Sequence, residues 1–193
     1  QEAGLGMFFR TPEFDLGTPN VNHTIALDLP VRWTMFVGGP VMGPAVLFWG
    51  ELVVLLIMAY GLGKLRYLPL KTYHWVLICL GTANIDFLAT LIVVGWFLAV
   101  HSRSRFAKEL PDWGFNVAQI FVVGLTIITL GTVYMVVSTG LLSAPNMEIH
   151  GFDSTSTTLK WFQDRTPGVL PQAWVISLPI LAYRIFMLIW ALW

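Results

Sequence analysis

The stretch "YHWVLICLGTANIDFLATLIVVGWFLAV", residues 73–100, is mostly apolar, but it contains a few polar residues and the carboxylate of Asp86. A single helix over these residues would be roughly 42 Å long, whereas the hydrocarbon core of a bilayer is about 30 Å thick. Either the region is one tilted helix, or "YHWVLICL" is an interfacial or re-entrant piece that breaks near Gly81, with the span running from about 83 to 100. Which of these two alternatives holds decides on which side of the membrane each later loop lies.

The composition places the whole chain among membrane proteins. Of its 193 residues, 56% are hydrophobic and only 11% are charged, whereas a typical soluble domain is about 25% charged. The net charge is zero, so there is no basic field to attract a nucleic acid. The single cysteine, Cys79, and the four scattered histidines lack metal-ligand spacing. We therefore expect neither a metal, another cofactor nor a nucleic-acid partner.

Apolar runs of sufficient length recur along the chain. They predict about four transmembrane helices, over 42–62, 73–100 or 83–100, 115–139 and 173–193. We expect the last of these to be kinked at Pro179. The resulting prediction is an all-α integral membrane bundle with a short N-terminal extramembrane β segment. The expected divisions are an extramembrane segment 1–39, the first three spans within 40–139, a polar extramembrane loop 140–172 and the last span 173–193.

The N-terminal segment contains one clear strand pattern, "TIALDLPVRWTMF", residues 24–36. Apolar and polar side chains alternate along it, which is typical of a half-buried strand. Pro30 has no N–H to donate, which favours an edge strand or a bulge. Because one strand cannot bury its own apolar face, we expect it to pair with a sheet outside this sequence or with another chain.

Two basic segments give conflicting information on topology. The first contains Lys64, Arg66 and Lys71, and the second contains Arg103, Arg105 and Lys108. Cytoplasmic loops are enriched in such residues, but simple alternation of four spans would put the second segment outside. A re-entrant region 73–100 would put both basic segments inside and the loop 140–172 outside. Both arrangements stay open at this point.

Several stretches together carry a resemblance to a known kind of protein: "GGPVMGPAVLFWG", "LPLKTYHWVLICLG", "VVGWFLAV", "LKWFQDRTPGVLPQAWVISLP" and "YRIFMLIWALW". In pieces covering nearly the whole chain, it resembles the C-terminal membrane region of a family of large bacterial envelope proteins, in which a long β-rich exported part precedes a few transmembrane helices. The resemblance implies an inner-membrane location with a periplasmic N-terminal segment, and a strand 24–36 that closes a β domain lying upstream. It implies no activity.

Three ionisable residues fall in or near the predicted spans: Glu51, Asp86 and Arg184. At that depth a charged side chain is costly and usually faces the bundle interior in a pair. One reading is a structural clamp between Arg184 and either Glu51 or Asp86. The other is a proton or ion relay through the same residues. Asn84 is a further intramembrane polar residue, on roughly the opposite side of the helix from Asp86.

Smaller residues in the predicted helices suggest two further roles. Thr82, Asp86 and Thr90 are spaced so that they share one helix face. The two hydroxyls could hydrate the carboxylate or help coordinate a cation, or they could satisfy it by hydrogen bonds within a packed bundle. In the third predicted span, Gly124 and Gly131 would allow another helix to approach closely.

The loop 140–172 offers little support for catalysis. His150, Asp153 and Ser154 are the residue types of a catalytic triad. However, catalytic triads are not normally built from residues so close together in the sequence, and no nucleophile elbow is present. There is also no glycine-rich nucleotide-binding motif. We therefore do not expect an enzyme.

These observations favour an integral membrane anchor or assembly subunit, which tethers an exported β-rich portion or packs within a larger envelope complex. Its expected partners are the lipid bilayer and either other membrane subunits or further copies of itself. The alternative is a proton- or ion-coupled transport component that uses Glu51, Asp86 and Arg184.

Overall fold

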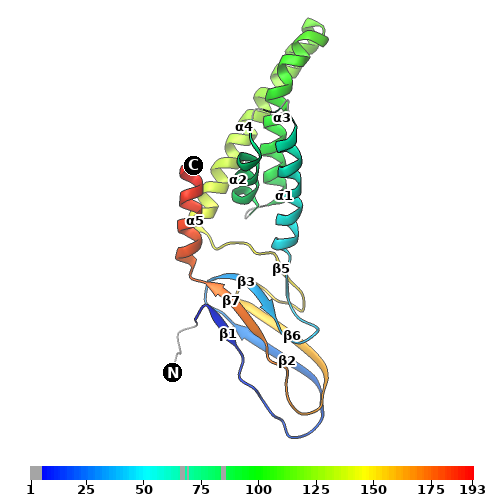
Figure 1. The fold of residues 1–193 in the computed structure, drawn as a ribbon, viewed down its shortest axis with the longest axis vertical. Coiled ribbons are helices and arrows are strands. Elements are labelled where there is room, and N and C mark those ends of the chain that lie inside the picture. Colours follow the sequence, from blue (N-terminus) through cyan, green and yellow to red (C-terminus); the bar gives the residue numbers. More distant parts are fainter. Residues whose placement is uncertain (1–5, 66–67, 69, 84–85) are drawn as a thin grey trace. The chain divides into compact units, whose positions relative to one another are not determined.

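The computed structural model describes residues 6–65, 68, 70–83 and 86–193, with the backbone alone at 104–109. The chain divides into two compact units (Figure 1). Unit 1 comprises Gln1–Trp49 and Ala144–Phe186, and unit 2 comprises Gly50–Ser143 and Met187–Trp193. The strands belong to unit 1, and most of the helical residues belong to unit 2.

The prediction of an all-α bundle of about four transmembrane helices is wrong, because the fold is mixed α/β. Within the described residues, the strands form three sheets. In the same part of the chain, α4 (Asp112–Leu142) is the one helix both long and apolar enough to cross a membrane. Two other helices are too short for a bilayer core of about 30 Å: α2 (Thr72–Thr82) is roughly 16 Å long and α5 (Ile180–Leu192) roughly 20 Å.

The longest strand pair in unit 1 joins β2 (Asn20–Asp28) to β6 (Thr158–Thr166) in antiparallel register. The alternation predicted for this part of the sequence is present, since Ile25 and Leu27 lie on the half-buried face of β2. On β6 the residues opposite them are Trp161 and Leu159, which are fully buried. The expectation that the strand needs a partner from outside this sequence is therefore wrong.

The predicted strand 24–36 is divided in two around Pro30. β2 ends at Asp28 and β3 (Trp33–Gly38) begins after a short loop. β3 belongs to a second antiparallel sheet, in the order β1 (Phe8–Arg10), β7 (Trp174–Leu178), β3. In the loop, Arg32 Nε donates a hydrogen bond of 2.9 Å to Ser177 Oγ. Because proline cannot donate to a ladder, the chain uses this position to pass from one sheet to the other.

Residues 140–178 supply the strands that pair with the N-terminal part of unit 1, so neither the predicted loop 140–172 nor the helix predicted from 173 matches the structure. The loop contains β5 (Ile149–His150) and β6, and β5 pairs with β4 (Ala45–Val46). The predicted last helix begins only at Ile180, because β7 precedes it. Pro179 lies between the strand and the helix, where it disfavours helical backbone before it and suits a first helical turn. It does not kink the helix.

In unit 2, the apolar region 73–100 breaks between α2 and α3 (Phe87–Glu109). α1 (Phe48–Lys64) begins later than the predicted 42, because β4 occupies the preceding residues, and α3 continues well past the predicted 100. α2 and α3 run antiparallel, with the rings of Trp75 and Phe97 in contact near one end and Thr82 bonded to Thr90 near the other.

α3 and α4 form a second antiparallel helical pair. Only Leu110 and Pro111 separate them, and such short connections join antiparallel neighbours. Their register is marked by Trp96 Nε1, which donates a hydrogen bond of 2.9 Å to Thr126 Oγ1. α3 therefore lies between α2 and the longest helix of unit 2.

Candidate functional site

Asp86 marks the N-terminal boundary of α3. Its side chain is exposed, and its Oδ1 accepts a hydrogen bond of 3.0 Å from the backbone N–H of Leu88. Aspartate is a favoured cap because its carboxylate satisfies an otherwise unpartnered N–H and opposes the partial positive charge of the helix N-terminus. The structure thus places Asp86 at a helix end instead of within a continuous helix.

Thr82 and Thr90 lie beside each other but on different helices. Their Oγ1 atoms are 2.7 Å apart, and Thr82 Oγ1 also donates to the carbonyl of Ile78 at 2.8 Å. Both side chains are buried. The two hydroxyls therefore form a hydrogen bond that joins α2 to α3, whereas the Asp86 carboxylate binds the backbone of α3. Asn84 lies outside the described residues.

The other two ionisable residues also lie near helix ends. Glu51 is in the first turn of α1, where a carboxylate is stabilised by the helix dipole. Arg184 lies in the first half of α5, and its side chain is exposed. Arg184 belongs to unit 1, whereas Glu51 and Asp86 belong to unit 2. The clamp and the relay therefore both stay predictions.

Close helix contacts in unit 2 are made by glycines other than the predicted ones. A Cβ atom added to Gly124 or Gly131 would meet no atom within 4 Å. At Gly81 it would collide with the indole of Trp190, and at Gly140 with the side chain of Met187. Gly81 and Gly140 are thus the positions where absence of a side chain lets α5 approach its neighbours. Trp190 Nε1 also donates 2.8 Å to the carbonyl of Leu77.

We expect Gly81→Leu to lower the free energy of unfolding of the full chain by about 1–3 kcal/mol, as overpacking does in well-filled interiors. The indole of Trp190 occupies the space that the new side chain needs. Gly124→Leu is the matched control, because its Cβ enters open space and leucine is the better helix former. Thermal unfolding in mild detergent measures both, and equal losses of stability would contradict the assignment of Gly81 to helix packing.

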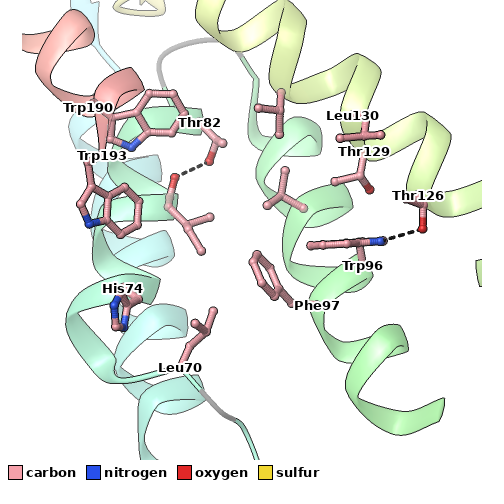
Figure 2. Close-up of a pocket in the computed structure, with 13 residues that line it drawn as sticks. Leu70, His74, Thr82, Trp96, Phe97, Thr126, Thr129, Leu130, Trp190 and Trp193 are labelled. Atoms are coloured by element: carbon pink, nitrogen blue, oxygen red, sulfur yellow. Dashed lines mark hydrogen bonds between the residues drawn. The ribbon is translucent and has the colours of Figure 1, made fainter.

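An apolar groove of about 350 Å³ lies within unit 2 (Figure 2). It extends along α2 from His74 to Thr82, a distance of roughly 12 Å for eight helical steps. Figure 2 shows Trp190 and Trp193 on one side and Trp96 with Thr126 on the other. This groove has the size and the mostly apolar lining of a ligand site, at the small end of the usual range.

Two polar atoms at the groove have no hydrogen-bond partner within the described structure. Thr129 lines the groove and is only 4% exposed, yet its Oγ1 is unpartnered. The Nδ1 of His74 is likewise buried and unpartnered. Buried polar groups are nearly always hydrogen-bonded, so these two atoms are exceptions within the walls of the groove, whose own surface is apolar. The groove was missed from sequence because its lining comes from four helices and follows no local motif.

The remaining polar cluster, in the segment between α4 and β6, is structural. His150 Nε2 lies 3.0 Å from Glu148 Oε2, and Ser154 Oγ accepts a hydrogen bond of 2.9 Å from the N–H of Lys160. Asp153 has a positive φ of 53° in the intervening turn. Ser154 is thus engaged with backbone near β6, and His150 with a carboxylate.

The described part of the chain contains no group of three or more histidine, cysteine, aspartate or glutamate residues that could hold a metal ion. No family model, curated protein or solved structure matches this chain. The protein is therefore described by its fold: an antiparallel β unit, and a helical unit whose described residues include one helix able to cross a membrane and an apolar groove.

Proposed function

We propose that this protein is a membrane anchor and assembly subunit, whose helical unit lies in the lipid bilayer and whose β unit lies outside it. The observation that carries the proposal is α4. It has 31 residues, and only 11% of its most apolar 18-residue window is buried. A helix in water turns one apolar stripe to the core and polar residues to the solvent. α4 instead leaves large apolar side chains exposed over most of its length.

The exposed side chains of α4 are the kind that lipid or another apolar helix would cover. They include Ile120, Phe121, Ile127, Ile128, Leu130, Tyr134 and Met135. Trp113, which is 73% exposed in the first turn, has the residue type that is enriched at membrane–water interfaces. Exposed apolar patches of this extent are rare on soluble monomers.

Strand pairing constrains the number of membrane crossings. The segments 6–49 and 144–186 are joined by the β2–β6 and β3–β7 ladders, so both lie on the same side of any membrane. The chain between them must then cross an even number of times. If α4 crosses once, one other crossing is needed. α1 is the best candidate, because its 17 residues extend roughly 25 Å and it leads directly out of unit 1.

The antiparallel pairing of α2 and α3 reconciles this topology with the basic residues. Because α3 returns alongside α2, Arg103 near its C-terminal end and Lys71 before α2 lie at the same end of unit 2. Positive residues concentrate on the cytoplasmic side. We therefore place both basic segments in the cytoplasm, treat α2 and the apolar part of α3 as a re-entrant hairpin, and place the β unit in the periplasm of a bacterial inner membrane.

The anchor role assigns a different task to each of the two units. In this proposal the helical unit tethers the β unit to the bilayer. Gly124 and Gly131 face open space on α4, where small residues let a helix of another subunit or a second copy approach. Such lateral contacts would make the chain one component of a larger envelope assembly.

Accessibility labelling of single cysteines tests this topology. In a Cys79→Ala background, we expect Asp153→Cys to react with a membrane-impermeant maleimide in intact spheroplasts. We expect Lys71→Cys and Arg103→Cys to react only after the membrane is permeabilised, because both lie at the cytoplasmic end of unit 2. All three side chains are exposed, so their intrinsic reactivity is comparable.

The controls separate insertion from orientation. Extraction with alkaline carbonate should leave every variant in the membrane fraction if the helical unit is inserted. Release of the chain by carbonate would refute the anchor. Labelling of Lys71→Cys and Arg103→Cys on opposite sides would refute the re-entrant hairpin and restore simple alternation of spans.

A further inference from the structure

We propose that the groove along α2 binds one hydrocarbon chain of an anionic phospholipid, with the phosphate at the N-terminal end of α2. The proposal rests on the membrane location proposed above. It adds a specific site with a preferred lipid class to what would otherwise be general contact with the bilayer. Three features support it: the shape and lining of the groove, its opening, and the charge at one end.

The lining suits a hydrocarbon chain better than a polar ligand. Ile78 and Val93 contribute aliphatic surface, and Trp96, Phe97 and Trp190 contribute aromatic surface. The hydroxyl of Thr126 is already used, because it accepts from Trp96 and donates to the carbonyl of Val122 at 2.7 Å. The groove is long relative to its volume of about 350 Å³, which favours an extended chain over a compact molecule.

The groove opens where lipid would be present. Leu130 and Val133 of α4 line it and are 66% and 36% exposed, and Trp193, which follows α5, is 54% exposed. Their exposed side chains belong to the same apolar surface that the proposed function places in the bilayer. A lipid chain could therefore enter laterally from the membrane without passing through water.

One end of the groove carries a positive charge from its own chain segment. Leu70 and His74 line that end, and Lys71 between them is the N-cap of α2, with no side-chain cap hydrogen bond. A lysine is an unfavourable neighbour for the partial positive charge of a helix N-terminus, whereas an anion is favourable. No aspartate or glutamate occurs between Lys64 and Thr82.

A further polar group is close to the same end. Gly63 in the last turn of α1 is in close contact with Thr72, which brings the end of α1 near the start of α2, while the Lys64 ammonium lies over the Tyr60 ring, 5.1 Å from its centroid. His74, whose Nδ1 is buried and unpartnered, stacks against Trp193 with ring centroids 6.1 Å apart (Figure 2). A phosphate at this position would meet Lys71, the uncapped N–H groups of α2 and the imidazole.

Lipid retention by the purified full chain tests the site. The protein in a neutral detergent is incubated with dioleoyl phosphatidylglycerol or dioleoyl phosphatidylcholine, and native mass spectrometry counts the lipid retained per chain. We expect one retained phosphatidylglycerol, about tenfold less retention in Leu130→Trp, whose larger side chain occupies the groove, and weaker retention of phosphatidylcholine. Lys71→Gln should remove the preference for the anionic lipid.

Ile127→Trp is the matched control, because Ile127 lies on the same helix and is 68% exposed but does not line the groove. It should retain lipid as the wild type does. Equal retention by Leu130→Trp and Ile127→Trp, or no preference between the two lipids, would overturn the proposal. Because retention is measured in detergent, its failure is distinguishable from failure of the anchor, which carbonate extraction and cysteine labelling report.

Discussion

Replacement of Trp161 by alanine is expected to lower the free energy of unfolding of unit 1 by about 3–5 kcal/mol, the usual cost of removing a large buried aromatic side chain. Trp161 is 1% exposed on β6 and lies against Gly39 and Gly43, where an added Cβ would collide with its indole. It also faces Ile25 across the β2–β6 ladder.

Tryptic cleavage after Lys160 provides a readout specific to this unit, because Lys160 is held in the same strand. In Trp161→Ala, the cleavage rate should rise by about two to three and a half orders of magnitude, since the population of the opened strand follows the lost free energy. Trp113→Ala is the control. Trp113 is 73% exposed at the start of α4, so its removal should leave cleavage after Lys160 unchanged. Similar rates in the two variants would show that Trp161 does not hold the sheet together.

The features that the sequence predicted well depend on neighbouring residues. The half-buried face of β2 follows from strict alternation at Ile25 and Leu27. The break in the region 73–100 is one of the two alternatives that the sequence left open, on the grounds of the mismatch between its length and a bilayer and of Gly81 within it. The structure has the break a few residues after Gly81, and Asp86 caps the helix that follows.

The strands missed by the sequence analysis depend on long-range pairing. β7 reads "WVISL", a short and mostly apolar run that periodicity cannot distinguish from the start of a buried helix. β6 does alternate at Leu159 and Trp161, but its second half contains Gln163, Asp164 and Arg165 and reads as a polar loop. What makes both segments strands is pairing with β2 and β3, more than one hundred residues earlier, and that is not encoded in local pattern.

In the candidate site, too, some features follow from local sequence and others depend on residues that are distant along the chain. The types of residue were predictable, because small residues and threonines in apolar helices commonly serve packing. Which glycine packs is decided by its partner: Trp190 lies against Gly81 and Met187 against Gly140, whereas a Cβ added to Gly124 or Gly131 would meet no described atom within 4 Å. Thr82 and Thr90 lie on two different helices and are joined by a hydrogen bond. Spacing along a single helix predicted that Asp86 would lie on the same face as both threonines, so it could not predict this arrangement.

A lysine at the centre of α4 distinguishes lipid from water around this helix. Ile127 is midway along α4 and 68% exposed. In water, such a substitution on an exposed surface changes stability by about 0.5 kcal/mol or less, whereas lysine at the centre of a membrane helix costs about 2.5–3.5 kcal/mol. Ile127→Lys should therefore reduce the ratio of inserted to non-inserted chain about a hundredfold, measured as the carbonate-resistant fraction after synthesis in the presence of inner-membrane vesicles.

The control for this experiment is the same new side chain at an exposed apolar position of the β unit. Val21 on β2 is 56% exposed, and the proposed topology places it in the aqueous periplasm, so Val21→Lys should leave insertion unchanged. The two positions have similar geometric exposure, and only the surrounding solvent differs between them. If Ile127→Lys inserted as well as Val21→Lys, the exposed apolar surface of α4 would not be in lipid, and the anchor proposal would have to be abandoned.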